Sequence, residues 1–311
     1  MKHLTLIVGM LMTVLTLHAQ DNAQRQQYKT LKNLSYIDAD DTSAYRRERC
    51  LLDIYMPACD TDAPKGKKDK TQKGNKDKTQ KGKKTKQQKD DNSSATAAKK
   101  GFKTIVWFHG GGLEGGDKEL RPELMNSGFA IVAPNYRLFP RCKCPDYTRD
   151  AAAAVAWTVK HIAEYGGDPS QVYVGGHSAG GYLTLMLALD KSYLGACGID
   201  ADSIKGYFPV SGQCATHYTI RKERKISYTL PIVDKMAPLN NARRMGTRLV
   251  LITGDRRLEQ TSRYEESLYL KSVLEGMGNA TIPIHELSGF DHGTVLAPAC
   301  LLIRDIMRKD R

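Results

Sequence analysis

The feature that most constrains this chain is a serine between closely spaced glycines, directly after an apolar run. Residues 171–175 predict a buried strand, and the sequence Gly-His-Ser-Ala-Gly follows at 176–180. On a sharp turn from strand to helix, side chains two positions before and after the serine would collide. Glycine at both positions relieves that clash. The pattern therefore predicts that Ser178 is held in a strained, exposed conformation suited to a nucleophile.

A second glycine-rich segment lies upstream of the serine. The apolar run 104–108 predicts another buried strand, and it leads directly into His-Gly-Gly-Gly at 109–112. Acyl transfer develops negative charge on a carbonyl oxygen, and glycines let backbone N–H groups approach that oxygen where a Cβ would obstruct them. A glycine-rich turn without a catalytic role is the alternative. We expect an oxyanion hole made by the N–H groups of Gly111, Gly112 and Ala179.

Four segments together resemble the bacterial carboxylesterases related to hormone-sensitive lipase, which are α/β-hydrolases. They are HGGGLEGGDK at 109–118, Asn-Tyr-Arg-Leu at 135–138, EYGGDP at 164–169 and GHSAGG at 176–181. The resemblance covers roughly residues 45–60 and 101–309, and its motifs are specific for fold and reaction type rather than for substrate. It implies a serine carboxylic-ester hydrolase with no metal and no organic cofactor.

The order of the remaining segments also predicts an α/β fold with a doubly wound, mostly parallel sheet, because strands alternate with helices. Further strands are expected at 129–133, 206–210, 248–252 and 281–287. Helices are expected at 146–165, 180–189, 262–277 and 294–307. The alternating segment 49–55 adds an antiparallel strand at the N-terminal edge.

The chemistry also needs a histidine, and the chain order in this fold is serine, acid, histidine. His292 lies in the loop after the last expected strand and is the predicted base. His217 falls between strands in an expected cap, and His285 lies within a strand, where a histidine is usually structural. His109 is expected to order the glycine loop rather than to act as a base.

The acid of the triad is expected in the loop after strand 248–252. In the resembled family it lies about three residues after a glycine, a place that Arg257 occupies in this chain. Asp255 and Glu259 flank that arginine. We predict Asp255, because a short carboxylate near the strand end is better fixed, whereas Glu259 would open the next helix, where its charge favours the positive dipole end. Asp291 is expected to point away from its neighbour, the predicted base.

One catalytic domain with appendages is expected from the length of the chain. Residues 1–19 look like a secretory signal peptide, which predicts export to a bacterial periplasm or beyond, and a retained anchor is the alternative. Residues 20–60 form the N-terminal edge of the catalytic domain, and residues 101–311 form its main part. A cap is expected at approximately 211–241, with Tyr218, Tyr228 and Met236 lining the acyl site.

The remaining residues, 61–100, form a lysine-rich insert. Residues 65–89 hold twelve lysines and two aspartates, a local charge of +10 out of the formal +13 of the chain. A segment without apolar residues cannot offset the entropy of ordering, so a disordered loop is expected. Because aromatic residues that would stack on bases are absent, nucleic acid is not an expected partner. Weak association of residues 65–89 with polyanions is the alternative to a merely solvated loop.

Cysteine usage gives a weaker constraint. Seven cysteines are an odd number, so in an oxidising compartment at least one is expected to be free or paired with another chain. Cys142 and Cys144 are too close in sequence to favour a bridge with each other. No Cys/His group has the spacing of a zinc site, so no metal is expected.

The residues together predict acyl transfer through an acyl-enzyme on Ser178, with His292 as the proton carrier. The expected substrates are small acyl or aromatic esters, including acetyl or feruloyl groups on polysaccharide by analogy. An amide hydrolase, either an aryl-formamidase or a peptidase, is the alternative. A non-catalytic binding module is disfavoured because nucleophile, base and oxyanion loop are all present.

Overall fold

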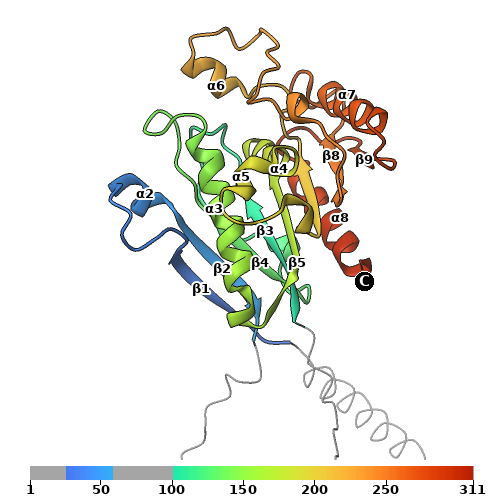
Figure 1. The fold of residues 1–311 in the computed structure, drawn as a ribbon. Coiled ribbons are helices and arrows are strands. Elements are labelled where there is room, and N and C mark those ends of the chain that lie inside the picture. The colour runs from blue at the N-terminus through green and yellow to red at the C-terminus, as the bar shows by residue number, and fades with distance from the viewer. Residues whose placement is uncertain (1–25, 59–100, 311) are drawn as a thin grey trace, which may run out of the picture.

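The computed structural model describes residues 26–58 and 101–310, which form a nine-stranded sheet with helices on both faces (Figure 1). The strands are β1 Tyr28–Ser35, β2 Leu51–Pro57, β3 Phe102–Phe108, β4 Ala130–Pro134, β5 Gly167–His177, β6 Gly206–Val210, β7 Arg248–Leu249, β8 Leu251–Gly254 and β9 Ile284–Leu287. The α-helices are α2 Ala44–Arg49, α3 Asp146–His161, α4 Ala179–Leu189, α5 Lys191–Gly195, α6 Tyr218–Glu223, α7 Arg263–Gly276 and α8 Leu296–Lys309. Short 3-10 helices are η2 Pro122–Leu124, η3 Ile162–Tyr165, η4 Ala201–Ser203 and η5 Pro238–Asn241.

The sheet has the strand order β1-β2-β4-β3-β5-β6-β8-β9, with β7 also paired to β6. Strand β2 is antiparallel to both of its neighbours, and the pairs from β4 to β9 are parallel. The predicted doubly wound, mostly parallel sheet is therefore confirmed. Because parallel strands end at the same edge, the loops after β3, β5, β6, β8 and β9 gather there.

The antiparallel N-terminal edge is confirmed, but a strand that was not expected, β1, lies outside β2 as the outermost strand. The sequence of β1 has little alternation, and its pairing is irregular between Leu31 and Leu34, where Asn33 has a left-handed φ of 58°. The Asn33 N–H donates to Asp53 Oδ1 at 2.8 Å, which anchors the irregular part to β2. Since β2 is paired on both sides, its residues after Leu51 are all buried instead of alternating.

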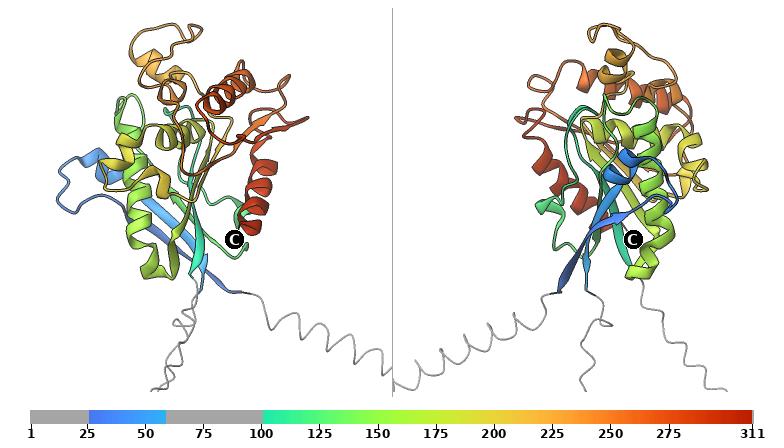
Figure 2. Two further views of the ribbon diagram at one scale, coloured as in Figure 1. Left: turned by 45° about the vertical axis from the view of Figure 1, so that its right-hand side comes forward. Right: turned by 90° about the vertical axis from the view of Figure 1, so that its left-hand side faces the viewer.

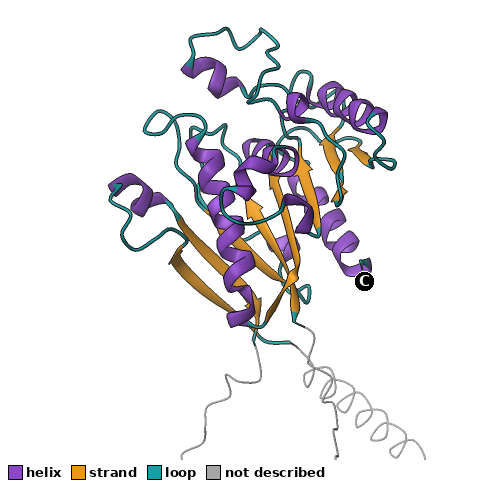
Figure 3. Cartoon of the chain, viewed as in Figure 1, coloured by secondary structure: helices purple, strands orange, loops and turns teal. Residues whose placement is uncertain are grey.

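Two apolar layers lie on opposite faces of the sheet. Val106 and Phe108 of β3 belong to the layer that includes side chains of α3, α4 and α7. Ile105 and Trp107, which point the other way, pack in the layer that includes α8. Figures 2 and 3 show α3 and α8 on opposite sides of the strands. In the described ranges, none of the helices has the length and apolar content needed to cross a bilayer.

Some sequence expectations fall on residues that the structure does not describe, and another concerns the pairing of cysteines. The signal peptide expected at 1–19 and the lysine-rich insert expected at 61–100 lie outside the described residues. Six cysteines fall inside the described ranges, and all six carry free thiols. Cys142 and Cys144 therefore do not bridge each other.

The turn between β5 and α4 is as sharp as the serine motif predicts. A Cβ on Gly176 would lie 2.7 Å from the carbonyl group of Gly180, and a Cβ on Gly180 would overlap the carbonyl oxygen of Phe108. Ser178 has φ 55° and ψ −112°, a conformation that residues other than glycine rarely adopt. The two glycines thus allow the chain to hold Ser178 in this strained turn.

The clash at Gly180 gives a prediction for stability. We expect Gly180→Ala to lower the free energy of unfolding by about 3 kcal/mol or more, because the added methyl group must displace backbone rather than a flexible side chain. Gly276→Ala is the matched control, since nothing lies within 4 Å of its added Cβ, and we expect a change below about 1 kcal/mol. Urea denaturation of both variants measures the difference, and equal midpoints would contradict the steric argument.

Candidate active site

Three loops at the carboxyl edge of the sheet bring together a hydroxyl, an imidazole and a carboxylate. Ser178 follows β5, Glu259 lies between β8 and α7, and His292 follows β9. His292 Nε2 is 2.9 Å from Ser178 Oγ, and His292 Nδ1 is 2.5 Å from Glu259 Oε1. The two ring nitrogens therefore link a nucleophile to a carboxylate, which is the geometry of a Ser-His-acid triad.

The structure corrects the prediction that Asp255 is the acid. The Asp255 carboxylate accepts hydrogen bonds from Arg257 Nε and Nη2 at 3.0 and 2.8 Å and from the N–H of Gly289 at 2.9 Å. These contacts hold it against the backbone of the histidine loop, and the carboxylate on the His292 ring belongs to Glu259. Glu259 is the alternative that the sequence left open.

A tight turn after β8 explains why Glu259, which lies farther from the end of β8 than Asp255, contacts His292. The N–H groups of Leu258 and Glu259 both donate to the carbonyl oxygen of Asp255 at 2.8 Å, so the chain coils back over the strand end. Glu259 Oε2 then accepts the N–H of Gly254 at 3.2 Å. Arg257, at the position where the resembled family carries its acid, points outward with 79% of its side chain exposed.

The Glu259 side chain is buried, with 1% exposed, and hydrogen bonds keep it ionised. Burial by itself would raise its pKa, but hydrogen bonds from His292 and Ser211 lower the pKa of Glu259 to about 2. Ser211 Oγ donates to Glu259 Oε2 at 2.5 Å. The sequence did not point to Ser211 as a site residue. The only available signal was that Ser211 directly follows the strand expected at 206–210.

His177 is a second residue that sequence analysis overlooked, although it lies inside the serine motif. Its Nε2 donates to the carbonyl oxygen of His292 at 2.7 Å, and the two rings lie 4.9 Å apart. Burial lowers the pKa of His177 to about 4, so its ring is neutral near pH 7. This contact ties the turn that carries Ser178 to the loop that carries His292.

The glycine loop lies beside the serine. A Cβ on Gly110 would be 3.4 Å from Ser178 Cβ. Gly111 and Gly112 have φ values of 104° and 67°, and within the described part of the chain neither N–H donates to a protein acceptor. The N–H of Ala179, the first residue of α4, has no intrahelical acceptor. Three unused donors thus lie near the nucleophile, and their role as an oxyanion hole stays a prediction.

His109 packs as a structural part of this loop. Its ring is stacked on Tyr136 at 4.4 Å, and the Tyr136 hydroxyl donates to the His109 carbonyl oxygen at 2.9 Å. Burial lowers the pKa of His109 to about 4. The ring is therefore neutral near pH 7 and is placed to order the glycine loop.

The other candidate residues lie away from the reacting groups. His217 is buried in the cap against Tyr182 and Tyr218, and His285 lies in β9. Asp291 Oδ1 accepts the N–H groups of Gly293 and Thr294, which are 3.0 and 2.8 Å away, and so turns into its own loop.

The cap segment, 211–241, contains α6 and η5, and α6 lies above the carboxyl edge of the sheet (Figure 1). Tyr218 lies against the glycine loop, because its hydroxyl would overlap a Cβ on Gly112. Two of the expected lining residues are placed otherwise. Tyr228 is 74% exposed, and Met236 is buried in the core, where its carbonyl oxygen accepts the Tyr182 hydroxyl at 2.7 Å.

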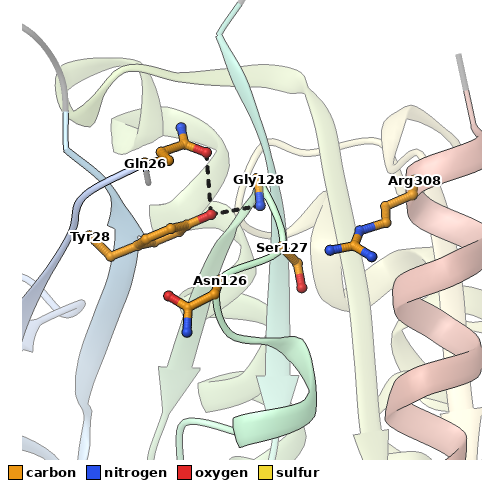
Figure 4. A pocket seen from close by; sticks show the side chains of 6 residues that line it. All are labelled: Gln26, Tyr28, Asn126, Ser127, Gly128 and Arg308. Carbon is orange, nitrogen blue, oxygen red and sulfur yellow. Dashed lines mark hydrogen bonds between the residues drawn. The ribbon is translucent and has the colours of Figure 1, made fainter. Parts of the chain in front are cut away.

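A hollow elsewhere on the molecule is not part of this site. It is lined by Gln26, Tyr28, Asn126, Ser127, Gly128 and Arg308 (Figure 4). Residues 126–128 precede β4 and therefore lie at the amino ends of the parallel strands, whereas Ser178 follows the carboxyl end of β5. The lining residues include no histidine or carboxylate that could serve as a base.

Comparison with known proteins places the chain in a family. A family model described as BD-FAE matches residues 91–257, which is more than half of the chain. The chain belongs to the BD-FAE family. The matched span of this BD-FAE protein includes the glycine loop and Ser178, and it ends before Glu259 and His292.

Similar curated proteins carry esterase names. The chain is 43% identical over 79 residues to the probable carboxylic ester hydrolase LipM of Mycobacterium tuberculosis, covering 25% of this chain and 18% of that protein. It is 36% identical over 89 residues to carboxylesterase NlhH of Mycobacterium tuberculosis, covering 27% and 28% of the two chains. The chain thus spans less than a third of the length of these relatives.

Solved structures share the fold over most of the chain. A truncated form of a carbohydrate esterase from gut microbiota has a TM-score of 0.65 at 17% identity, covering 92% of this chain and 96% of that one. Native esterase 2 of Thermogutta terrifontis has a TM-score of 0.56 at 18% identity, covering 91% of each chain. At these identities the likeness shows the fold alone, which is the α/β-hydrolase fold.

The contacts of the two acids give a prediction for catalysis. We expect Glu259→Gln to lower kcat for p-nitrophenyl acetate by about 10⁴-fold, because an amide does not hold the imidazole in the required tautomer or stabilise its charged form. We expect Asp255→Asn, the matched control, to lower kcat by at most a few-fold, since its contacts are with Arg257 and Gly289. Steady-state kinetics measures both effects, and the reverse ranking would return the role to Asp255.

The lowered pKa of Glu259 also predicts how stability depends on pH. Because its pKa in the folded protein lies below the ordinary value of 4.5, the carboxylate stabilises the fold fully above about pH 4.5. That contribution is lost as the pH falls toward about 2. Over this window we expect the free energy of unfolding to fall more steeply in the wild type than in Glu259→Gln. Urea denaturation at successive pH values measures the slopes, and parallel slopes would count against an ionised Glu259 in the folded protein.

Proposed function

We propose that this protein is a carboxylic ester hydrolase that forms an acyl-enzyme on Ser178. The observation that carries the proposal is the chain of contacts from Ser178 Oγ through His292 to Glu259, at 2.9 and 2.5 Å. Membership of the BD-FAE family and the esterase names of LipM and NlhH support the same reaction class.

The proposed reaction begins when Ser178 Oγ bonds to the ester carbonyl carbon while His292 Nε2 takes its proton. The Nδ1–H of His292 stays donated to Glu259, which fixes the tautomer and stabilises the imidazolium. The carbonyl oxygen becomes negative and accepts hydrogen bonds from the glycine-loop amides and from Ala179. The bond to the alcohol oxygen then breaks, and His292 protonates the departing alcohol. Water repeats the sequence on the acyl-enzyme, which releases the acid and restores Ser178.

For substrate we propose small acyl or aromatic esters, including acetyl or feruloyl groups on polysaccharide. The polysaccharide part is supported by analogy, because similar folds include a carbohydrate esterase from gut microbiota and a bifunctional GH43-CE protein of Bacteroides eggerthii. The second of these has a TM-score of 0.62 at 16% identity, covering 90% of this chain and 38% of that one. We also propose that a signal peptide at 1–19 directs export of the protein, which would bring it to a substrate outside the cytoplasm.

The nucleophile is tested by Ser178→Ala, which we expect to lower ester hydrolysis by about 10⁴-fold or more while the urea midpoint stays close to that of the wild type. An organophosphonate should add covalently to the wild type at Ser178, as peptide mass would show. Retention of a tenth of the wild-type turnover would overturn the assignment.

The substrate class is tested with a panel of esters and amides. p-Nitrophenyl acetate, butyrate and octanoate report acyl length, and methyl ferulate reports aromatic acyl groups. N-formylkynurenine reports the aryl-formamidase alternative. Turnover of the formamide that exceeds that of every ester would replace the ester hydrolase with an amide hydrolase.

A further inference from the structure

Two arginines are buried, one in the cap and one at the start of α7. Arg221 lies in α6, and Arg263 is the first residue of α7, four positions after Glu259. They are only 5% and 4% exposed. Their Nε atoms are buried, and in residues 26–58 and 101–310 neither has a hydrogen-bond partner. A guanidinium group stays charged near neutral pH, so one that is buried normally lies against a carboxylate.

Neither arginine forms a salt bridge with a carboxylate of the described residues. Arg263 Nη2 donates to the Gln260 side-chain oxygen at 3.3 Å, and Arg221 Nη1 donates to the carbonyl oxygen of Leu230. Glu266 attracts both arginines and Glu259 also attracts Arg263, but neither carboxylate lies within salt-bridge distance of them, and Glu266 Oε2 accepts the backbone N–H groups of Cys214 and Ala215 at 2.7 and 3.0 Å. Burial lowers the pKa of both guanidinium groups, as expected where positive charge is poorly compensated.

A third polar group belongs to the same cluster. His217 is fully buried, its Nε2 has no hydrogen-bond partner within the described chain, and its carbonyl oxygen accepts the N–H of Arg221 at 3.1 Å, while the charges of both arginines act on its ring. Its pKa is lowered by burial and then by the charges of Arg263 and Arg221, so its ring is neutral near pH 7. Two cationic side chains and an imidazole nitrogen are thus gathered together with unused hydrogen-bonding capacity.

The cap connects this cluster to the glycine loop. The rings of His217 and Tyr218 lie 4.4 Å apart, and the Tyr218 hydroxyl would overlap a Cβ on Gly112. The Thr219 hydroxyl donates to the carbonyl oxygen of Gly112. Tyr218 and Thr219 therefore connect His217 of this cluster to the glycine loop.

We propose that Arg221, Arg263 and His217 form a subsite for a carboxylate carried by the ester substrate. The inference rests on the proposed ester hydrolase function and narrows its substrate class to acidic esters. A carboxylate would accept hydrogen bonds from the unused guanidinium N–H groups, whose planar arrangement matches its two oxygens, and would compensate the buried charge. The carboxylate has two chemical sources: the acyl part, as in a half-ester of a dicarboxylic acid, or the alcohol part, as in an acylated uronic acid.

Two substrate pairs distinguish these sources. The acyl pair is p-nitrophenyl hydrogen succinate and p-nitrophenyl butyrate, and the alcohol pair is the acetyl ester of a methyl glucuronoside and that of a methyl glucoside. We expect the wild type to prefer the acidic member of one pair by about tenfold or more in kcat/KM, because a site built for a polar group rejects an analogue that lacks it. The pair that shows the preference identifies the source.

Variants of the arginines test the assignment. Arg263→Gln and Arg221→Gln should each reduce the acidic-to-neutral ratio of kcat/KM by about tenfold. Arg224→Gln is the matched control, because Arg224 closes the same helix but is paired with Asp234 at the surface, and it should leave the ratio unchanged. An equal fall in all three variants would reveal only a long-range charge effect and would overturn the subsite.

A binding measurement covers variants that fail to fold and separates this inference from the proposed function. Succinate and methyl glucuronoside are titrated into Ser178→Ala protein by calorimetry, with butyrate, methyl glucoside and inorganic phosphate as controls at equal ionic strength. Saturable binding of one carboxylate alone supports the subsite even if no ester is hydrolysed. Hydrolysis of neutral esters without acidic preference and without carboxylate binding would overturn the subsite and leave the ester hydrolase in place. Binding of phosphate alone would overturn the carboxylate assignment.

Discussion

The candidate site depends on a buried carboxylate, which must accept hydrogen bonds at both of its oxygens. Glu259 meets this need with groups from separate parts of the sheet edge: His292 after β9 at one oxygen, and Ser211 after β6 together with Gly254 of β8 at the other. An ionised carboxylate taken from water without such partners would be strongly unfavourable. The same contacts that keep Glu259 charged therefore hold three loops in register around Ser178.

Further contacts, which take no part in the proposed reaction, hold the loops around the site in place. His177 donates to the carbonyl oxygen of His292, and the Asp255 carboxylate accepts the N–H of Gly289, so two side chains hold the histidine loop. Asp255 thus adds a contact to the histidine loop although it does not contact the imidazole. On the other side of the serine, the stacking of His109 on Tyr136 orders the glycine loop. The cap, by contrast, contains a buried arginine, Arg221, that forms no salt bridge with a carboxylate of the described residues.

Much of the fold and of the candidate site could be predicted because the sequence signals for them are local. A continuous apolar run predicts a strand buried on both faces, as for β6, which matches its expected range of 206–210. Ser178 could be assigned because glycines at 176 and 180 are needed by the turn itself. The edge strand β1 was missed because an exposed, irregular edge needs no alternating pattern, and Ser211 was missed because its role depends on a residue from another loop.

By itself the sequence determined the α/β-hydrolase order of elements, the position of Ser178 on its turn, the glycine loop and the histidine that follows the last strand. Each of these depends on neighbours within a few residues or on chain order. Only the tertiary structure shows which of the two acids contacts His292, because the turn after β8 reverses the chain and places Glu259 over Gly254 while Asp255 is held by Arg257. The burial of Arg221 and Arg263 was likewise beyond sequence reasoning, since it depends on how the cap helix and α7 pack in space rather than on spacing along the chain.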